Sequence, residues 1–385
     1  MTIVLASILW LCVALVVYAY AVYPPLIWLC ARLFGGRRQA PLLDDAALPA
    51  MTLLIAAHNE AEVIAARLEN ALTVEYPRDK FAIVVASDGS SDATMSIVRS
   101  YADRGVRLLD YQPNQGKAAT LNAALAEISG DLVLLSDANT HIDPRAPRLL
   151  ARWFADPRVG AVCGRLILTD PRTGRNVDSL YWKYETFLKK AEGRLGALLG
   201  ANGAVYAIRR ELFAPIPRET IVDDFVIPLL ARLRTGCGIV YDAEAVAHEE
   251  TPADLGSEFG RRSRIGAGGF QSIVLLWRLL DPRQGWTAFS FFSHKVLRWH
   301  CPFFLIAALA ANGLLLNVPA YRWLLAAQVA FYAVSLVGAF LPGTGLAAKL
   351  VRLTTLFTSM NLALLVGFWR WLSGRQRGAW QRTAR

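Results

Sequence analysis

A short run of residues, LVLLSDAN at 132–139, has the composition of a metal-binding strand end. Its four apolar residues are typical of a buried strand, and Asp137 and Asn139 follow within the next four positions. A carboxylate and an amide oxygen two residues apart can bind one hard cation. Mg²⁺ or Mn²⁺ held by few protein oxygens keeps positions open for substrate phosphates. The alternative interpretation is a polar turn that leads into a helix beginning near Asp143.

Two adjacent carboxylates, Asp223 and Asp224, lie inside the apolar stretch IVDDFVI at 221–227. Burying such groups without partners is costly. Partial desolvation raises the pKa of a carboxylate and suits it to take a proton from a hydroxyl nucleophile. The pair is therefore a candidate general base, and the alternative is that the two acids cap a helix.

Further polar residues follow other predicted strands. Asn59 and Glu60 come after the first strand, and Asp88 comes after the second. Asp88 is suited to accept hydrogen bonds from a nucleobase or a ribose, or else to cap the next helix. Lys117 closes the segment NQGK at 114–117 and is either a phosphate contact or a solvated helix start. Neither a Walker motif nor a dinucleotide fingerprint is present. The sequence therefore favours a nucleotide that is held by carboxylates and a metal over one that is held by a glycine-rich loop.

Two other segments could contact a substrate. The sequence GANG at 200–203 offers a tight backbone with one amide side chain, which could approach a sugar ring or form a simple turn. The sequence RRSR at 261–264 is basic. Such a run is usually a solvated face or a membrane-surface patch, but beside a metal–diphosphate site a guanidinium can bind departing phosphate charge.

The elements that position these residues alternate between short strands and helical patterns. Strands are predicted at 52–56, 82–86, 106–109, 132–135 and 204–208, and helices at 60–72, 92–102 and 117–126. This alternation predicts a parallel α/β sheet with right-handed crossovers. Ligands bind such sheets beyond the carboxyl ends of the strands, near the topological switch point. We therefore expect the polar clusters that follow the strands to meet at one edge.

Apolar segments flank this region, and the chain is 54% hydrophobic and 19% charged. Ile3–Cys30 is almost wholly apolar and its basic flank follows it, which predicts an anchor with its N-terminus outside the cell rather than a signal peptide. Three more spans are predicted at 301–317, 323–341 and 350–371, and an amphipathic interfacial helix at 286–300. A helical core in a soluble domain is the alternative for these segments.

The expected organisation has five parts. They are an anchor at 1–34, an α/β domain at 50–280, an interfacial helix at 284–300, transmembrane helices at 301–372 and a basic tail at 373–385. The basic flank of the anchor predicts a cytoplasmic α/β domain. Three later spans would place the basic tail outside, against the positive-inside tendency, unless one span is interfacial or re-entrant. The net charge of +10 is explained by anionic lipids and anionic substrates, without nucleic acid.

Together these residues resemble the membrane-integrated inverting glycosyltransferases of family 2, the group of the cellulose, hyaluronan and poly-N-acetylglucosamine synthases. The resemblance covers about Met51 to Trp299 and the flanking spans. It implies a Rossmann-like GT-A domain between transmembrane helices, located in the plasma (inner) membrane. It also implies a nucleotide diphosphate sugar as donor, with a UDP-sugar expected, and Mg²⁺ or Mn²⁺ as cofactor. The acceptor would be a glycan or a lipid-linked acceptor in exopolysaccharide or cell-envelope glycan synthesis.

The resemblance also implies roles for single residues. Nucleoside-binding positions match Ala57, Asn59, Glu60 and Asp88, with Lys117 near the nucleotide. The metal-binding DxD position matches Asp137 and Asn139, and Asp224 matches the general base with Asp223 beside it. The acceptor loop would contain Gly200, Asn202 and Gly203. Arg261, Arg262 and Arg264 resemble the QxxRW segment of processive members.

The sequence departs from the family pattern at two places. The DxD position ends in the neutral Asn139, which weakens the metal site or leaves that ligand role to the diphosphate. Ile265 stands where tryptophan is usual and Arg261 where glutamine is usual, which weakens the case for processive synthesis. Sugar transfer is therefore better supported than processive synthesis, and a non-processive transferase that adds one sugar to a lipid is the alternative. From another class, the chain would be a transporter with a nucleotide-sensing domain or a non-catalytic membrane subunit. A partner subunit that works with an active synthase is a further alternative.

Overall fold

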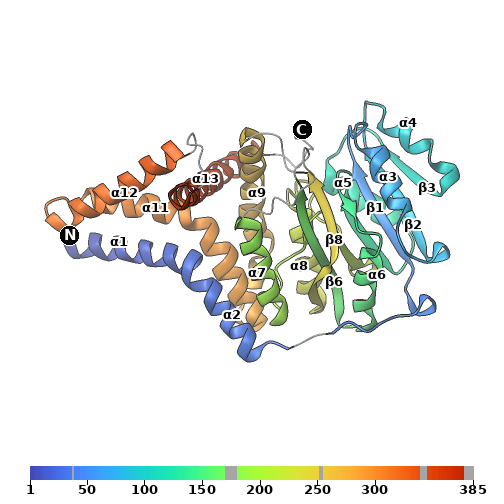
Figure 1. Cartoon of the computed structure of the whole chain (residues 1–385), viewed down its shortest axis with the longest axis horizontal. Helices are drawn as coiled ribbons and strands as arrows, with labels where there is room; N and C mark the ends of the chain where they lie inside the picture. The colour runs from blue at the N-terminus through green and yellow to red at the C-terminus, as the bar shows by residue number, and fades with distance from the viewer. Residues whose placement is uncertain (37–38, 170–179, 251–254, 339–344, 377–385) are drawn as a thin grey trace. The chain divides into compact units, whose positions relative to one another are not determined.

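The computed structural model describes the chain except for residues 37–38, 170–179, 251–254, 339–344 and 377–385. Its described residues form two compact units. The sheet unit contains Ile27–Ala253 and Val274–Ser290, and the helical unit contains Met1–Leu26, Asp254–Ile273 and Phe291–Gln376. The stretch 254–273, expected in the α/β domain, thus belongs to the helical unit. Figure 1 labels most of the elements of both units.

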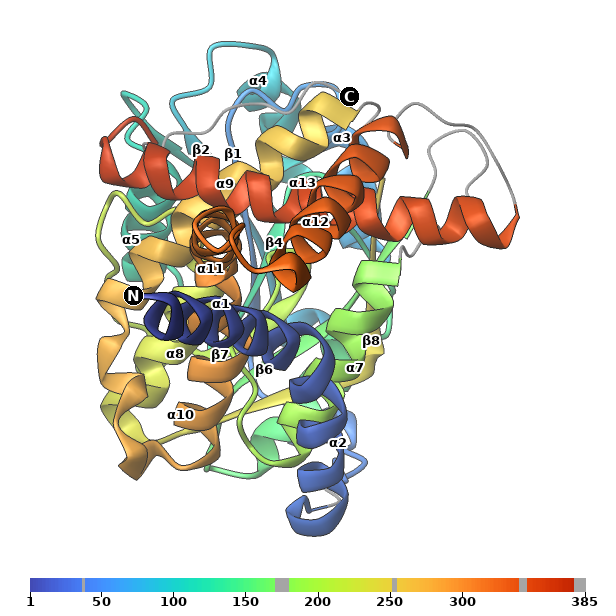
Figure 2. The same ribbon diagram turned by 90° about the vertical axis from the view of Figure 1, so that its left-hand side faces the viewer.

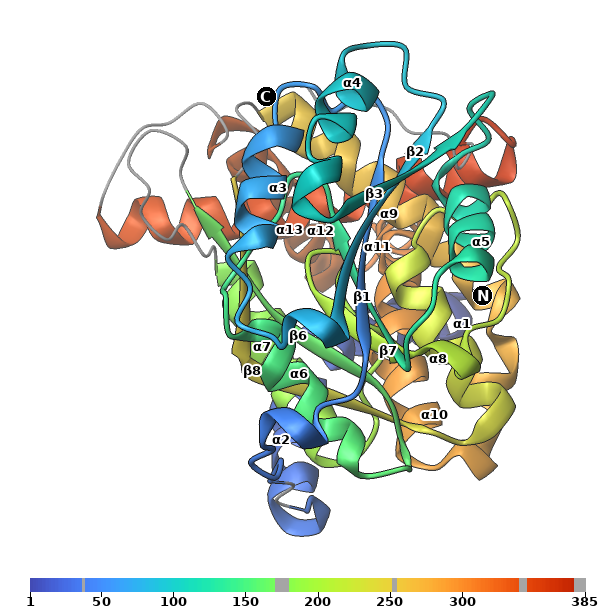
Figure 3. The same cartoon turned by 90° about the vertical axis from the view of Figure 1, so that its right-hand side faces the viewer.

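The first half of the sheet follows the sequence prediction. It contains the parallel strands β1 (Met51–Ala57), β2 (Phe81–Asp88), β3 (Val106–Tyr111) and β4 (Leu132–Asp137). Every residue of β1 is buried, as expected for a central strand covered on both faces. Figure 3 shows α3 and α5 on opposite sides of β1.

The second half of the sheet is mixed. The parallel pairing predicted from the strands at 52–56, 82–86, 106–109 and 132–135 is confirmed in the first half and does not extend to the second. It contains β5 (His141–Ile142), β6 (Val159–Thr169), β7 (Tyr206–Arg209) and β8 (Gly238–Glu250). β7 is antiparallel to both β4 and β6, β6 is parallel to β8, and β5 is antiparallel to β8. An apolar run marks a buried strand but does not record its direction, which is why periodicity could not distinguish the two halves.

The strand order among the described residues is β3-β2-β1-β4-β7-β6-β8-β5. The chain moves outward from β1 through β2 to β3 and then returns to the other side of β1 with β4. The topological switch point therefore lies between β1 and β4, where a ligand crevice is expected beyond the strand ends.

Helices complete the sheet unit. They are α2 (Tyr23–Phe34, which begins in the helical unit), α3 (Ile64–Leu72), α4 (Thr94–Arg99), α5 (Lys117–Glu127), α6 (Ala146–Ala151), α7 (Leu180–Arg194), α8 (Asp223–Thr235) and α10 (Trp286–Ser290). The helix predicted from residue 60 begins only at Ile64. The backbone N–H of Glu60 donates instead to Thr94 Oγ1, at 2.8 Å. The residues before α3 form a separate turn, in which the carbonyl of Glu60 accepts from the N–H groups of Val63 (3.0 Å) and Ile64 (2.9 Å).

Long helices form the helical unit (Figure 2). They are α1 (Thr2–Val17), α9 (Leu255–Leu275), α11 (Leu297–Gly313), α12 (Pro319–Gly338) and α13 (Leu346–Leu372), with π-helical turns at Tyr18–Val22 and Phe291–Val296. Within the described residues, three helices are long and apolar enough to cross a membrane: Thr2–Phe34, Pro319–Gly338 and Ala347–Leu372. The expected interfacial helix instead consists of α10, a π-helical turn and the start of α11.

Helices α1 and α11 pack antiparallel although they are far apart in the sequence. Leu9 of α1 is buried in one cluster with Ala308 and Ala311 of α11. Ala19, after the end of α1, is buried in another cluster with Leu297 at the start of α11. The two helices therefore run side by side over most of their length.

Candidate active site

Three charged side chains meet beyond the carboxyl end of β4. The ammonium Nζ of Lys117 lies 2.7 Å from Oδ1 of Asp137 and 3.3 Å from Oδ1 of Asp223. Asp137 ends β4, Lys117 begins α5 and Asp223 begins α8. The metal-ligand candidate Asp137 and Asp223 of the acidic pair, 86 residues apart in the chain, therefore share one lysine. This contact was not predicted from the strand pattern.

The charge of Lys117 is maintained by its two carboxylate partners. Burial disfavours the charged form, but Asp137 and Asp223 outweigh this effect and raise the pKa of Lys117 above its usual value. The side chain of Asp223 is only 9% exposed, whereas that of Asp137 is 30% exposed. Asp137 is thus the carboxylate that a ligand reaches more easily.

Asp88 positions the loop that carries Lys117. Its side chain is wholly buried, and its two carboxylate oxygens accept hydrogen bonds from the backbone N–H groups of Gln115 (2.8 Å) and Gly116 (2.9 Å). Gly116 has a φ of +93°, which an L side chain rarely adopts. The sequence suggested a nucleobase contact or a helix cap for Asp88. The structure instead shows both oxygens bonded to the loop before α5.

Asn59 joins two of the loops at this edge. It is the one described non-glycine residue with a positive φ, at 55°, a conformation that asparagine tolerates better than most residues. Its Oδ1 accepts a hydrogen bond from the backbone N–H of Ser91 at 2.8 Å. Ala57, fully buried, ends β1, and Glu60 is half-buried beside Asn59. These predicted nucleoside-binding positions therefore lie together at the end of β1.

The environment of Asp224 raises the pKa of its carboxyl group. Burial and the charge of Asp223 raise its pKa to about 6, while Lys117 opposes the shift, Asp137 adds to it and Lys189 opposes it. The residue that precedes α8 is Val222, and its side chain forms no capping hydrogen bond. The two acids are thus the first residues of α8 and do not occupy the cap position.

The 200–203 loop packs closely against both parts of the site. Ala201 N–H donates to the backbone carbonyl of Asp224 at 3.0 Å. Gly200 has a φ of +74°, and a Cβ there would lie 2.9 Å from Cα of Phe225. A Cβ on Gly203 would lie 2.7 Å from Oδ2 of Asp137. A side chain at position 203 would therefore force the Asp137 carboxylate to shift.

The side chain of Asn202 is used within the fold. Its Nδ2 donates to the carbonyl of Gly164 at 2.8 Å, and its Oδ1 accepts from Val205 N–H at 3.2 Å. The residue is only 8% exposed. Its amide therefore holds the loop against β6, which differs from the predicted contact with an acceptor sugar.

Sequence analysis missed Arg67, which lies on α3 and is wholly buried. Its Nε donates to the backbone carbonyl of Asp137 at 3.4 Å and its Nη1 to Oδ1 of Asn70 at 3.1 Å. Asn70 in turn bonds the N–H and the carbonyl of Ile142, at 2.8 and 2.9 Å. The signal was available, because Arg67 falls at helical spacing among the buried positions of α3, with Ile64 and Leu68.

Lys189 on α7 is a second charge near Asp224 that sequence analysis missed. Its Nζ lies 4.0 Å from Sγ of Cys163 and 6.0 Å from the centre of the Tyr241 ring. Burial opposes its charge, but Cys163, Tyr241, Glu185 and Asp224 together raise its pKa. Nothing in the sequence around position 189 distinguishes it from a solvated helix lysine.

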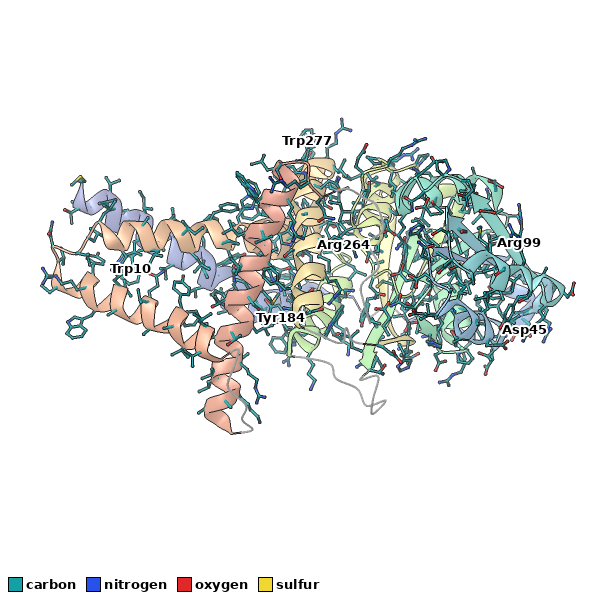
Figure 4. The ribbon with its side chains drawn as sticks, turned by 90° about the horizontal axis from the view of Figure 1, so that it is seen from above. Trp10, Asp45, Arg99, Tyr184, Arg264 and Trp277 are labelled. Atoms are coloured by element: carbon teal, nitrogen blue, oxygen red, sulfur yellow. The ribbon has the colours of Figure 1, made fainter. Side chains whose placement is uncertain are left out.

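The predicted arginine run lies on α9 in the helical unit, where Figure 4 shows Arg264. Arg261 Nε lies 2.9 Å from Oε2 of Glu258, and Arg262 Nε lies 2.7 Å from Oε1 of the same residue. Arg264 is exposed. Two of the three arginines thus pair with an acid of their own helix, and a role in diphosphate binding stays a prediction.

The residues at the end of β4 fit a cation that is bound together with phosphates. Asp137 offers an accessible carboxylate and Asn139, half-buried in the following turn, offers an amide oxygen. Within the described ranges, no group of three or more His, Cys, Asp or Glu side chains forms a closed metal cage. Mg²⁺ is commonly held by one or two carboxylates plus substrate phosphates, so this sparse donor set is compatible with Mg²⁺ or Mn²⁺.

Comparison with known proteins agrees with this geometry. Residues 52–214 match the family model "Glycosyl transferase family 2". This region is a family 2 glycosyltransferase domain. The chain is 27% identical over 276 aligned residues to the poly-beta-1,6-N-acetyl-D-glucosamine synthase of Staphylococcus aureus (strain COL). This match covers 66% of this chain and 65% of that protein. The enzyme of the same name from Staphylococcus epidermidis is 27% identical over 237 residues, 58% of this chain and 55% of that protein.

The chain also resembles a solved structure. This is the mannosyltransferase PcManGT from Pyrobaculum calidifontis in complex with GDP-Man and Mn²⁺, with a TM-score of 0.73 and 22% identity. The alignment covers 96% of this chain and 99% of that one. The fold is therefore GT-A, with apolar helices at both ends. The match spans about 65% of the length of the first curated relatives.

Proposed function

We propose that this glycosyltransferase moves a sugar from a nucleotide diphosphate sugar to a glycan or lipid-linked acceptor, with inversion at the anomeric carbon. The observation that carries the proposal is the cluster of Asp137, Lys117, Asp223 and Asp224 beyond the end of β4. In this cluster the accessible carboxylate of Asp137 can bind a cation, and the ammonium of Lys117 can bind phosphate. The carboxylate of Asp224 has a raised pKa. The named relatives support a role in exopolysaccharide or cell-envelope glycan synthesis.

Asp224 is the proposed general base. Its pKa of about 6 leaves it ionised at neutral pH and basic enough to take the proton of an acceptor hydroxyl. The hydroxyl oxygen then bonds to the anomeric carbon as the bond from that carbon to the diphosphate breaks, so the nucleoside diphosphate leaves with the electron pair. The ammonium of Lys117 is positioned to stabilise the departing negative charge.

Asp137 and Asn139 are the residues that would hold Mg²⁺ or Mn²⁺. Such a cation supplies Lewis-acid stabilisation of the diphosphate leaving group when bound. Asp88 and Asn59 hold the surrounding loops in place and leave the backbone near Ala57 and Glu60 to border the nucleoside.

We also propose that the protein is a multi-pass protein of the plasma (inner) membrane with its sheet unit in the cytoplasm. Three helices have the length and composition to cross. Because α11 packs antiparallel along α1, we expect α11 to cross at the same depth. Nucleotide sugars are made in the cytoplasm, and the basic flank after the first helix favours the same side. Membrane lipids would then surround the helical unit.

The donor and the product length are separate questions. The resemblance favours a UDP-sugar, whereas the solved relative holds GDP-Man. Ile265 and Arg261 depart from the processive pattern, which favours transfer of a single sugar to a lipid as the second candidate. A partner subunit would be needed only if the purified chain proves inactive with every donor and acceptor.

The test is release of nucleoside diphosphate by the full chain in detergent, with a panel of UDP- and GDP-sugars and with or without Mn²⁺ or Mg²⁺. We expect metal-dependent release with one donor, and loss of that release in Asp224→Asn. Lys183→Met, an exposed substitution on α7, is the control and should behave as wild type. Product size then separates polymer synthesis from single transfer. A folded protein that neither binds nor cleaves any of these donors would contradict the proposal.

A further inference from the structure

The ammonium of Lys117 lies where a cation is expected. It bridges Asp137 and Asp223, with Nζ to Oδ1 distances of 2.7 and 3.3 Å. Asp137 is also the proposed ligand of the divalent cation. The carboxylate of Asp137 therefore has two candidate positive partners, the divalent cation and the ammonium of Lys117.

The fold keeps Lys117 in this place. It is the first residue of α5, and the loop before it is held by two hydrogen bonds to the buried carboxylate of Asp88. Asp223 is 9% exposed, and a carboxylate so far removed from water needs a partner. The lysine is therefore a structural counter-ion and differs from an exposed surface pair, which contributes little.

A divalent cation that approaches Asp137 alone meets this ammonium and is repelled by it. A nucleoside diphosphate changes the balance, because its phosphate oxygens can bind the cation and attract the lysine at the same time. From this arrangement we propose that Lys117 is a resident counter-ion that opposes binding of the divalent cation alone, so that the cation binds tightly only together with the nucleoside diphosphate. The inference rests on the proposed metal-dependent function and specifies how that site discriminates between bare and nucleotide-bound cation.

The experiment measures Mn²⁺ binding directly, by the electron paramagnetic resonance signal of free Mn²⁺, with the full chain in detergent. Each protein is titrated alone, with UDP and with GDP. In the wild type we expect the better nucleotide to tighten Mn²⁺ binding by about 5- to 150-fold, the usual range of coupling between two ligands. In Lys117→Met, Mn²⁺ alone should bind more tightly than to wild type, and the added effect of the nucleotide should shrink.

Two further variants test whether the effect comes from the positive charge at position 117. Lys117→Arg keeps the charge and should keep the coupling, whereas Lys183→Met removes an exposed lysine and should match the wild type. Lys117→Gln replaces Lys117→Met if the latter does not fold. Unchanged or weaker binding of Mn²⁺ alone in the neutral variants would overturn the inference while leaving the proposed function intact. A wild type that binds nucleotide but no Mn²⁺ under any condition would overturn both.

Discussion

Transfer should increase roughly ten-fold as the pH rises from 5 to 7, because Asp224 must lose its own proton before it can accept one. Burial and Asp223 raise the pKa of Asp224 to about 6. At pH 5 about one tenth of such a group is ionised and at pH 7 about nine tenths, by the ordinary titration relation. The rate of a step that needs the ionised form follows this fraction.

The neighbouring charges decide in which direction a substitution shifts the pH–rate profile, the plot of transfer rate against pH whose rising part reports the pKa of Asp224. Lys189 opposes the upward shift of the Asp224 pKa, so Lys189→Met should raise that pKa and move the rising limb to higher pH. A substitution that only loosened the fold would lower the rate at every pH without moving the limb. The position of the limb therefore separates an electrostatic effect from a general loss of structure.

The assay is the initial rate of nucleoside diphosphate release at saturating donor and metal, measured from pH 5 to 8. Asp224→Asn should lower turnover by on the order of 10²–10⁴ and remove the limb. Near-normal turnover in that variant, with nucleotide still bound, would show that Asp224 is not the base. A flat wild-type profile between pH 5 and 7 would contradict the raised pKa.

Thermal unfolding provides the control for this variant. Because the folded-state pKa of Asp224 lies above its usual value, ionisation of the group costs stability, and this cost grows as the pH rises towards 6 and then levels off. Asp224→Asn removes the cost and should unfold at an equal or higher temperature at pH 7. If Asp224→Asn loses activity but keeps its stability, the loss comes from the proton-transfer step and not from unfolding.

Three other substitutions test the way the site is supported. Gly203→Ala should weaken Mn²⁺ binding in the presence of nucleotide, because its Cβ would lie 2.7 Å from Asp137 Oδ2; an unchanged Mn²⁺ titration would argue against this contact. Asn70→Ala should lower the free energy of unfolding by about 1–3 kcal/mol, since the N–H and carbonyl of Ile142 lose their partner; chemical denaturation measures it. Asp88→Ala should weaken binding of the nucleoside diphosphate by releasing the loop before α5, and calorimetry would show whether affinity is instead retained.

The first half of the sheet could be predicted from sequence because its strands are short, apolar and separated by amphipathic helices. The rule that ligand sites lie beyond strand ends predicted one edge for the polar residues that follow β1, β2 and β4. The contact of Asp137 with the acidic pair through Lys117 was not predicted. The direction of β7 could not be predicted, because a strand buried on both faces has the same apolar pattern whichever way it runs. Its pairing with β4 is decided by tertiary contacts.

Within the site, it was easier to predict which residues matter than to predict which groups they bond to. Asp88 was recognised as a functional carboxylate, but the donors it binds are 27 and 28 residues further along the chain. Arg67 was overlooked because a charged residue on a short helix usually faces water. Its spacing from Ile64 and Leu68 places it on the buried face of α3, where its Nε donates to the carbonyl of Asp137.

The antiparallel pair of α1 and α11 has a consequence for biosynthesis. About 280 residues separate the end of α1 from the start of α11, and at 5–20 residues per second the ribosome needs roughly 15–60 s to make them. During that time α1 has been synthesised but its partner has not. The first helix must therefore persist as a single inserted segment, or be held by the insertion machinery, while the entire sheet emerges and folds. Substitutions that make α1 less apolar should reduce the yield of assembled protein more than its activity per molecule.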